Sequence, residues 1–406
     1  MKYLILGKGK NGEGIRLVLE HLKIDYDFLD TEEVKKLKYD LVIKSPGIPI
    51  DLPIFKDIRK KGIEVITDIE LVFRYFPRRY IAITGTNGKT STTKMLSEIL
   101  ACEIKAVACG NIGYTICEAV LEHSEDTVFV VELSSFQLNN CRYFKPEISM
   151  LLNLGTAHQD FHGNIPSYHQ AKVKIAINQT EKNLLVYNGE DKNIIKMISD
   201  LKVTKISFSS KSSNKDCYFK GHYLYFKGQK IINKKLFEQS LSVVADNVLA
   251  AISVALYLGI SKKTIKRYFK KPKIDVHRLE QVDKYNFNDA KSTNPASTVM
   301  ALSKMNKPVL LLCGGKNRNE NLSELNPVLN KIKKAYSYGE TSLLLKDYFN
   351  LNNIDCETFT NLEEALIAIK EKRKKKEILL FSPIMASWDQ FKSYEERGDF
   401  FKKFFQ

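Results

Sequence analysis

The glycine-rich loop at residues 85–90 limits the possible folds of this chain more than any other feature. The run Arg79-Tyr80-Ile81-Ala82-Ile83-Thr84 before it is typical of a β-strand, and a helical pattern follows to about Leu100. The loop itself is Gly85-Thr86-Asn87-Gly88-Lys89-Thr90, where glycine permits the backbone angles that turn N–H groups toward a phosphate. Lys89 can reach the terminal phosphates and the Thr90 hydroxyl can reach Mg²⁺. We interpret the loop as a phosphate-binding loop in a parallel α/β domain.

The loop is shorter than the G-x-x-x-x-G-K-[ST] pattern requires, because Ile83 stands where the first glycine would be. The alternative is a glycine loop that binds nothing. The preceding strand, the following helix and the run Gly88-Lys89-Thr90-Ser91-Thr92 favour the phosphate loop over that alternative.

Acidic and imidazole side chains follow the next strands of this segment. Glu132 ends an apolar strand at 127–131, and His158 and Asp160 follow a strand at 148–152. Because parallel strands end at the same edge of a sheet, we expect these side chains near the phosphate loop. Glu132 suits Mg²⁺, which prefers oxygen ligands, so His158 needs separate support as a ligand.

The first 76 residues alternate strands with helices, which favours a parallel, Rossmann-like sheet. The G-x-G-x-x-G spacing is met at Gly7, Gly9 and Gly12, between a strand and a helix, and Asp30 follows about 20 positions on. Such a turn can hold a phosphate or diphosphate at a helix N-terminus. A tight turn without a ligand is the alternative.

We predict an α/β protein of three domains, at residues 1–76, 77–272 and 273–406. The first is Rossmann-like, and the second is a P-loop ATPase-type domain with a parallel sheet. The second also has hairpin-like stretches at 217–232 and an apolar helix at 242–258. The third has strands at about 284–287, 308–313, 335–338 and 377–381, which indicates another Rossmann-like unit.

Charge and cysteine content limit the function classes. The chain has 63 lysines and arginines against 47 acidic residues, a formal charge of +16. Nucleic acid is one partner for such a chain, but no RNA-recognition, zinc-finger or helix-turn-helix motif is present, and the basic cluster 372–376 is explained by a solvated helix end. Seven cysteines without a C-x-x-C pair indicate neither a zinc site nor a disulfide framework.

The apolar runs are too short for a membrane segment. None reaches the roughly 20 residues that a membrane helix needs, and the start of the chain leads directly into a glycine-rich turn. We therefore expect a cytoplasmic protein with neither a membrane nor a nucleic-acid partner.

Together with the phosphate loop, four further stretches resemble the Mur ligases, the ATP-dependent amide ligases that build the peptide stem of the bacterial cell wall. They lie at residues 110–113, 132–138, 288–294 and 382–391, in the order that the family has them. Within the family, the stretch 132–138 is most similar to the branch that joins D-glutamate to UDP-N-acetylmuramoyl-L-alanine. The resemblance implies an ATP-dependent ligase with ATP and two Mg²⁺ ions as cofactors.

The resemblance implies a role for each matching residue. The expected catalytic residues are Lys89, Glu132, His158 and Lys172, the last matching a lysine that is carbamylated in the family. The expected metal ligands are Thr90, Glu132, His158 and carbamylated Lys172. The residues expected to bind ATP are Gly85, Thr86, Asn87, Gly88, Lys89, Thr90, Ser91, Asn247, Arg278 and Asp289.

The substrates implied are small molecules, UDP-N-acetylmuramoyl-L-alanine and D-glutamate, bound by a monomer. For uridine and diphosphate the matching residues are Lys10, Asn11, Thr31 and Ser45. For the muramoyl group they are Asn111 and Ser134. For D-glutamate they are Lys291, Thr293, Ser387 and Tyr394.

The chain departs from the family at four places. The uridine-domain loop is polar at Lys10-Asn11, where an apolar-polar pair is common. Asp246 stands where a histidine is usual, and Ala157 where an acidic residue often precedes the metal-binding histidine. The run Lys316-Asn317-Arg318 leaves open which cation binds the side-chain carboxylate of D-glutamate.

Three other functions remain as alternatives. A different stem-peptide ligase or a folylpolyglutamate synthase shares the ATP loop, but the stretches 132–138 and 382–391 favour the D-glutamate branch. A nucleic-acid-stimulated ATPase is suggested by charge alone. A nucleotide sensor without catalysis does not explain the set of lysine, carboxylate and histidine.

Overall fold

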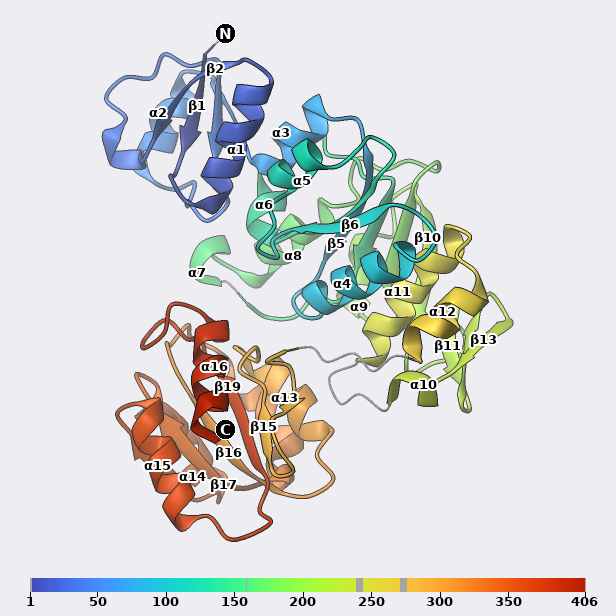
Figure 1. Cartoon of the computed structure of the whole chain (residues 1–406). Helices are drawn as coiled ribbons and strands as arrows, with labels where there is room; N and C mark the ends of the chain where they lie inside the picture. The colour runs from blue at the N-terminus through green and yellow to red at the C-terminus, as the bar shows by residue number, and fades with distance from the viewer. Residues whose placement is uncertain (1, 158, 239–243, 271–275, 406) are drawn as a thin grey trace. The chain divides into compact units, whose positions relative to one another are not determined.

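The computed structural model describes residues 2–157, 159–238, 244–270 and 276–405, without the side chains of residues 159, 160 and 238. The chain divides into two compact units, residues 1–237 with 244–271 and residues 272–406 with 238–243. The described residues form three sheets with helices between their strands (Figure 1). The predicted class, an α/β protein with parallel sheets, is confirmed.

The first sheet has four parallel strands in the order β2-β1-β3-β4. Its central strands β1 and β3 are buried apolar runs, as expected for strands covered on both faces. The Rossmann-like alternation predicted for this segment is confirmed. Its elements are β1 (Lys2–Leu6), α1 (Lys10–His21), β2 (Asp25–Leu29), the 3-10 helix η1 (Thr31–Glu33), β3 (Leu41–Lys44), α2 (Pro53–Lys60), β4 (Glu64–Ile66) and α3 (Asp68–Tyr75).

The second sheet belongs to the same unit, and the phosphate loop follows β5, the third strand from one end of this sheet. Its order is β13-β12-β11-β10-β9-β8-β5-β7-β6, parallel from β6 to β11 and antiparallel beyond. The predicted hairpins turn at Gly221 and Gly228, both with positive φ. Its strands are β5 (Arg79–Thr84), β6 (Ala106–Gly110), β7 (Val128–Glu132), β8 (Ile148–Leu151), β9 (Leu184–Asn188), β10 (Thr204–Ser209), β11 (Cys217–Lys220), β12 (Tyr223–Phe226) and β13 (Gln229–Asn233).

Helices connect these strands, and α4, which follows the phosphate loop, packs against α11. The predicted apolar helix at 242–258 is α11, although residues 242 and 243 lie outside the described residues. The helices are α4 (Lys89–Leu100), α5 (Ile116–Glu122), α6 (Ser135–Asn139), α7 (Gln159–His162), α8 (Ile165–Val173), α9 (Lys192–Met197), α10 (Lys235–Glu238), α11 (Ala245–Tyr257) and α12 (Lys262–Phe269).

The third sheet forms the second unit, with six strands in the order β14-β15-β19-β16-β17-β18. Only β14 is antiparallel, and the strand order reverses between β16 and β19, where parallel sheets usually bind ligands. The predicted boundary at residues 272 and 273 lies outside the described residues. The elements are β14 (Glu280–Gln281), β15 (Asn286–Asn288), α13 (Pro295–Ser303), β16 (Val309–Gly314), the 3-10 helix η2 (Leu322–Lys331), β17 (Ile332–Tyr338), α14 (Ser342–Leu351), β18 (Cys356–Phe359), α15 (Leu362–Lys372), β19 (Leu379–Ile384) and α16 (Tyr394–Phe405).

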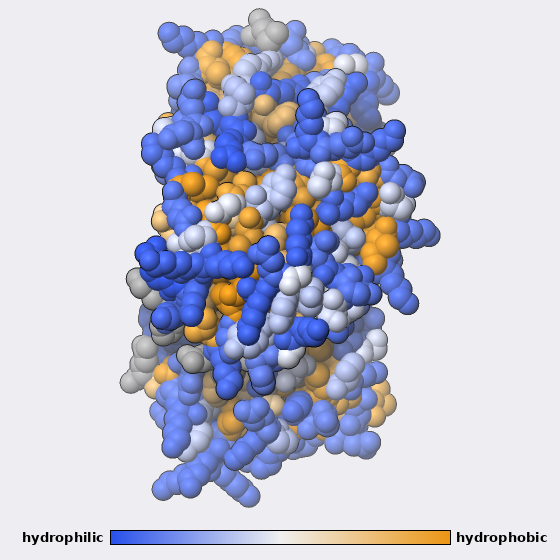
Figure 2. Space-filling view, turned by 90° about the vertical axis from the view of Figure 1, so that its right-hand side faces the viewer, coloured by the Kyte–Doolittle hydropathy of each residue, from blue (hydrophilic) through white to orange (hydrophobic). Residues whose placement is uncertain are grey.

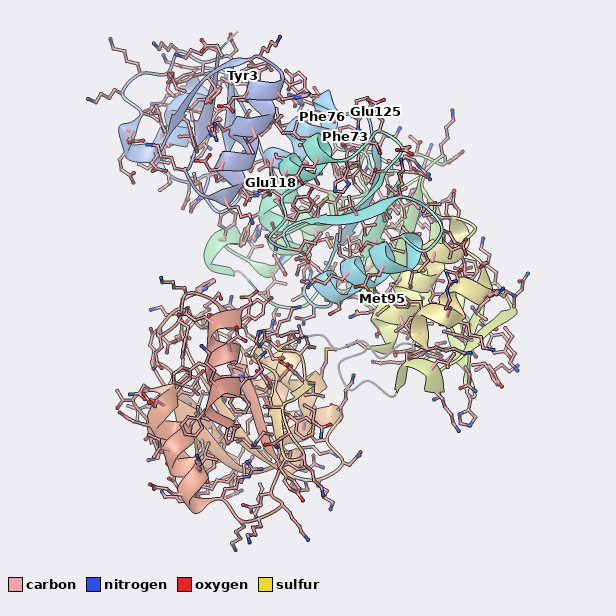
Figure 3. The ribbon with its side chains drawn as sticks, viewed as in Figure 1. Tyr3, Phe73, Phe76, Met95, Glu118 and Glu125 are labelled. Atoms are coloured by element: carbon pink, nitrogen blue, oxygen red, sulfur yellow. The ribbon has the colours of Figure 1, made fainter. Side chains whose placement is uncertain are left out.

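One apolar core is shared by the first two sheets. Tyr3 on β1, Phe76 after α3 and Tyr80 on β5 all belong to it, and Phe73 packs against it. The ring of Phe73 lies 5.5 Å from that of Phe144 in an edge-to-face arrangement. Three residues of this core region, Tyr3, Phe73 and Phe76, are labelled in Figure 3. The segment 66–82 therefore connects the two sheets through packing as well as through the chain.

The surface agrees with the lysine-rich composition. Hydrophilic residues cover most of the face in Figure 2, and hydrophobic residues show between them in small areas. Among the described residues, no helix combines the length and the apolar character needed to cross a membrane.

Candidate functional site

The phosphate loop leaves β5 at Thr84 and enters α4 at Lys89. Gly88 caps the helix with a left-handed φ of 86°, which glycine adopts without strain. A Cβ atom at Gly88 would lie 2.4 Å from the Oδ1 atom of Asn247, so the loop and the start of α11 are in close contact. The free N–H groups at the start of α4 suit an anion. The structure thus brings predicted ATP residues from two distant segments together.

Asn153, after β8, holds the loop from the neighbouring strand. Its Oδ1 accepts from the backbone N–H of Asn87 at 2.8 Å, and its Nδ2 donates to the Asn87 carbonyl at 3.0 Å. Its own carbonyl accepts from Thr86 N at 3.1 Å. Asn153 was not among the predicted site residues. Its position directly after a strand, like that of Glu132 at the end of β7, could have indicated that Asn153 lies near the loop.

The Thr86 hydroxyl ties the loop to two further segments. Its oxygen accepts from Gly155 N at 2.8 Å, and the Tyr168 hydroxyl on α8 lies 3.2 Å away. The His169 ring lies 3.0 Å from the Gly155 carbonyl through Nε2. Tyr168 and His169 were therefore also missed as parts of the site.

Lys172, on α8, reaches the same loop. Its Nζ donates to the Gly85 carbonyl at 2.9 Å, and Lys89 Nζ donates to that carbonyl and to Thr86 O. Lys172 is 1% exposed. Burial, and next the charge of Lys89, lower the pKa of Lys172 well below its usual value, against the attraction of Glu132. The structure therefore brings Lys89, Lys172 and Glu132, three of the four predicted catalytic residues, together at the phosphate loop.

Glu132 ends β7 with one oxygen bonded and one free. Asn111 Nδ2 donates to its Oε1 at 3.2 Å. Its Oε2 is buried and finds no hydrogen-bond partner among the residues that the structure describes. A buried carboxylate oxygen without a partner fits a magnesium ligand. His158 lies outside the described residues, and the described part of the chain shows no group of three or more His, Cys, Asp or Glu side chains suited to a metal.

Asn111 and Ser134 lie at neighbouring strand ends. Gly110, before Asn111, pairs with Glu132 in the register of β6 and β7. Ser134 caps α6: its Oγ accepts from Gln137 N at 3.3 Å, while Gln137 Oε1 accepts from Ser134 N at 3.1 Å. The two predicted muramoyl contacts therefore flank Glu132.

The predicted uridine and diphosphate residues lie at the carboxyl edge of the first sheet. Lys10 and Asn11 open α1, and Thr31 opens η1. Ser45 Oγ donates to the Gly7 carbonyl at 3.0 Å. Lys10 Nζ also donates to the carbonyl of Gly113, so this edge of the first sheet contacts the loop after β6.

The second unit holds the remaining predicted residues. Asp289 is buried, which raises its pKa, and it accepts from Ser382 Oγ at 2.8 Å. Arg278 Nη1 donates to Ser292 Oγ at 3.2 Å. The Lys291 ammonium lies 5.9 Å from the ring of Tyr394. Since Arg278 and Asp289 are in this unit, their part in ATP binding stays a prediction.

Two cations near the strand-order reversal differ in environment. Arg318 donates through Nη2 to the Thr293 carbonyl and to Glu320, each at 2.8 Å, and its Nε is buried without a partner among the described residues. Lys316 instead forms a surface ion pair with Glu340 at 2.6 Å. Arg318 is thus the cation that contacts a predicted D-glutamate residue.

Asp246, which stands at one of the departures from the family, has a structural contact. Its Oδ1 accepts from Ser210 N at 3.1 Å, directly after β10. The residue therefore ties the start of α11 to the second sheet beside Asn247.

A phosphate loop on a parallel sheet, with two lysines and a buried carboxylate at the same edge, defines a nucleotide-dependent enzyme of the P-loop type. Residues 83–256 match the family model for the Mur ligase middle domain. Curated UDP-N-acetylmuramoylalanine–D-glutamate ligases are similar over most of their length. The protein from Bacillus cereus (strain G9842) is 37% identical over 376 residues, 91% of this chain and 84% of that protein. The protein from Bacillus anthracis (strain A0248) is 36% identical over the same shares.

Solved structures agree in fold. The MurF ligase from Thermotoga maritima in complex with ADP has a TM-score of 0.62 at 17% identity, over 99% of this chain and 94% of that one. The UDP-N-acetylmuramate–alanine ligase of the same organism has a TM-score of 0.59 at 16% identity, over 95% and 96%. The chain belongs to the Mur ligase family, in its branch of UDP-N-acetylmuramoylalanine–D-glutamate ligases.

Proposed function

We propose that this ATP-dependent ligase joins D-glutamate to UDP-N-acetylmuramoyl-L-alanine through an acyl phosphate, in the synthesis of the cell wall. The observation that carries the proposal is the convergence of Lys89, Lys172 and Glu132 at the phosphate loop. The similarity to D-glutamate ligases over 91% of the chain supports the choice of substrates.

The reaction follows from the chemistry of a carboxylate, which is a poor electrophile. Its oxygen attacks the γ-phosphorus of ATP and ADP leaves, giving an acyl phosphate. The amine of D-glutamate then attacks the acyl carbon, a proton is lost, and phosphate leaves. Lys89 and the N–H groups at the start of α4 neutralise the charge on the transferred phosphoryl group.

The magnesium site is part of the proposal. Glu132, Thr90 and His158 would hold Mg²⁺, which would supply further charge neutralisation at the phosphates. The unpartnered Oε2 atom of Glu132 supports this assignment.

Lys172 supports a second metal site after modification. Its burial and its neighbour Lys89 lower the pKa of the amine, which favours the uncharged form, and the uncharged amine is the form that reacts with CO₂. The nitrogen forms a bond to carbon and releases a proton, which leaves an anionic carbamate. The Lys172 side chain would thereby offer carbamate oxygens as ligands for a metal at the phosphate loop.

In the second unit, Arg318 would bind the side-chain carboxylate of D-glutamate, and Lys291, Thr293, Ser387 and Tyr394 would complete the pocket. The contact between Arg318 and the Thr293 carbonyl supports Arg318 over Lys316. Asn11, Lys10, Thr31 and Ser45 would bind the uridine diphosphate. The proposal includes a cytoplasmic location, where ATP and the nucleotide-linked substrate are made, and a monomeric enzyme.

The test is phosphate release from ATP with UDP-N-acetylmuramoyl-L-alanine and one amino acid at a time. Release and a product of the expected mass should occur with D-glutamate and not with L-glutamate, L-alanine or a diamino acid. Release with another amino acid would keep the ligase chemistry and overturn the specificity. Lys89→Ala should lower the rate by at least about a hundredfold.

A further inference from the structure

Asp68, the first residue of α3, is a buried carboxylate that accepts hydrogen bonds from two distant segments. Its Oδ2 accepts from Asn11 Nδ2 at 2.8 Å and from Gln137 Nε2 at 3.0 Å. The side chain is 1% exposed, and its Oδ1 has no partner in the described part of the chain. Both bonds therefore depend on a single oxygen atom.

Each of these donors leads to a proposed substrate contact. Asn11 is one itself, at the start of α1. Gln137 orients the other, because its Oε1 accepts from both the N–H and the Oγ of Ser134, at 3.1 Å each. Thr67, beside Asp68, donates to the Gln137 carbonyl at 3.0 Å. A continuous chain of hydrogen bonds thus joins the start of α1 to the start of α6.

The charge around Asp68 is balanced by one cation. Lys44 is fully buried, donates to the carbonyls of Pro46 and Ile48 at 2.9 Å, and is attracted to Asp68. Burial raises the pKa of Asp68, and the hydrogen bonds from Gln137 and Asn11 oppose that rise. Hydrogen bonds in a dry site are strong and directional. The side chain of Asp68 is therefore suited to fixing the distance between the start of α1 and the start of α6.

We propose that Asp68 is a positioning residue that sets the spacing between the diphosphate-binding start of α1 and the muramoyl-binding start of α6. This rests on the proposed function. One UDP-linked sugar must contact both helix starts, so a spacing fixed before binding lowers the cost of ordering the site.

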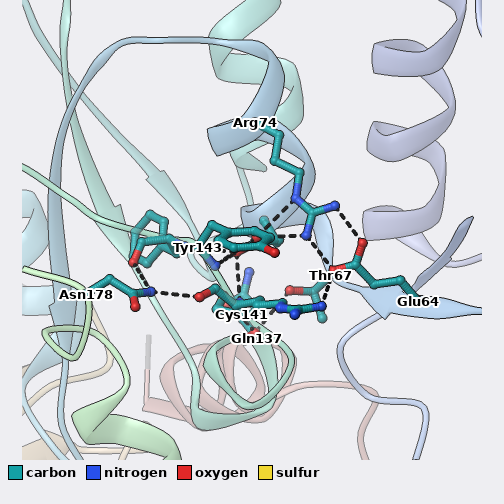
Figure 4. A network of polar contacts seen from close by, with 10 residues as sticks. Glu64, Thr67, Arg74, Gln137, Cys141, Tyr143 and Asn178 are labelled. Carbon is teal, nitrogen blue, oxygen red and sulfur yellow. Dashed lines mark hydrogen bonds and ion pairs between the residues drawn. The ribbon is translucent and has the colours of Figure 1, made fainter.

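Glu70, two residues along α3, is a matched control. It is fully buried and accepts hydrogen bonds from the backbone N–H groups of Arg142, Tyr143 and Phe144. It therefore joins α3 to the segment that follows α6. It donates nothing to and accepts nothing from Asn11 or Gln137 among the contacts described. Figure 4 shows the surrounding network, in which Thr67, just before α3, and Arg74 on α3 face Gln137 and Tyr143.

The experiment is titration calorimetry of UDP-N-acetylmuramoyl-L-alanine against the full chain without ATP. Asp68→Ala should weaken binding at least about tenfold. Asp68→Asn keeps an acceptor oxygen and Glu70→Gln leaves the link intact, so both should stay within about threefold of the wild type. ATP affinity, measured separately, should stay the same in all variants.

Equal affinity of Asp68→Ala and wild type, or equal losses in Asp68→Ala and Glu70→Gln, would overturn the inference. If Asp68→Ala does not fold, Gln137→Met removes the link from the other side and should cost at least about fivefold in affinity; no change there would overturn it too. A wild-type chain that does not bind the substrate would instead refute the proposed function.

Discussion

Lys89 and Lys172 donate hydrogen bonds to the same atom, the carbonyl oxygen of Gly85, and both distances are 2.9 Å. Two ammonium groups so close together repel each other, so the charge of Lys89 lowers the pKa of Lys172. The arrangement favours loss of the proton from Lys172, the more buried of the two.

Lys172→Ala should lower the rate of phosphate release by about a hundredfold or more, because an anionic ligand would be lost from the site. Short carboxylic acids should restore part of the rate by occupying the vacated space. The same acids should leave Lys89→Ala inactive, since they cannot replace a cation. Absence of rescue for Lys172→Ala would argue against a carbamate.

Gly88→Ala should abolish nucleotide binding and destabilise the chain by about 1–3 kcal/mol, because it combines a positive φ with a close approach to Asn247. Gly62 has a similar φ of 67° but no atom within 4 Å of an added Cβ. Gly62→Ala should therefore cost only about 1 kcal/mol and leave ATP binding unchanged. Denaturant unfolding and ATP calorimetry compare the two variants, and equal effects on ATP affinity would contradict the role of the contact.

Arg318→Ala should raise KM for D-glutamate by about tenfold or more with little change in KM for ATP, because a charged hydrogen bond to the substrate would be lost. Lys316→Ala removes a surface ion pair and should change that KM less than about twofold. Steady-state kinetics with D-glutamate as the varied substrate decide between them. The reverse result would assign the carboxylate to Lys316.

Lys44 predicts a pH dependence of stability. Burial lowers its pKa from 10.5 to about 8 in the folded chain. Between these values the unfolded chain keeps the proton and the folded chain releases it, so the unfolding free energy rises with pH. Relative to Lys44→Met, the wild type should gain about 3 kcal/mol from pH 8 to 10.5. Denaturant titrations at several pH values measure this difference, and a constant difference would contradict the shift.

The sequence predicted local features better than long-range ones. The phosphate loop was recognised because glycine, lysine and threonine stand at fixed spacing between an apolar strand and a helix. The strands 79–84, 127–131 and 148–152 are confirmed to within one residue at each end, as β5, β7 and β8. Their unbroken apolar runs are typical of buried parallel strands.

Features that depend on distant pairing were missed. β18, with the sequence Cys356-Glu357-Thr358-Phe359, has no apolar run, and only its pairing with β17 defines it as a strand. Asn153 holds the phosphate loop because β8 pairs with β5, and Asp68 reaches Asn11 across 57 positions. No local pattern encodes either contact. The proposal that Arg318 binds D-glutamate likewise depends on a long-range contact, its hydrogen bond to the carbonyl of Thr293.

The apolar core shared by the first two sheets makes residues 1–76 a poor module to exchange or express alone. A fragment ending at residue 76 would keep all four strands of its sheet but expose Phe73, Phe76 and the inner face of α1 to water. The two sheets should therefore melt in one cooperative transition rather than as separate foldons. For protein engineering, a transplant of the nucleotide-sugar half must carry β5 and α5 with it.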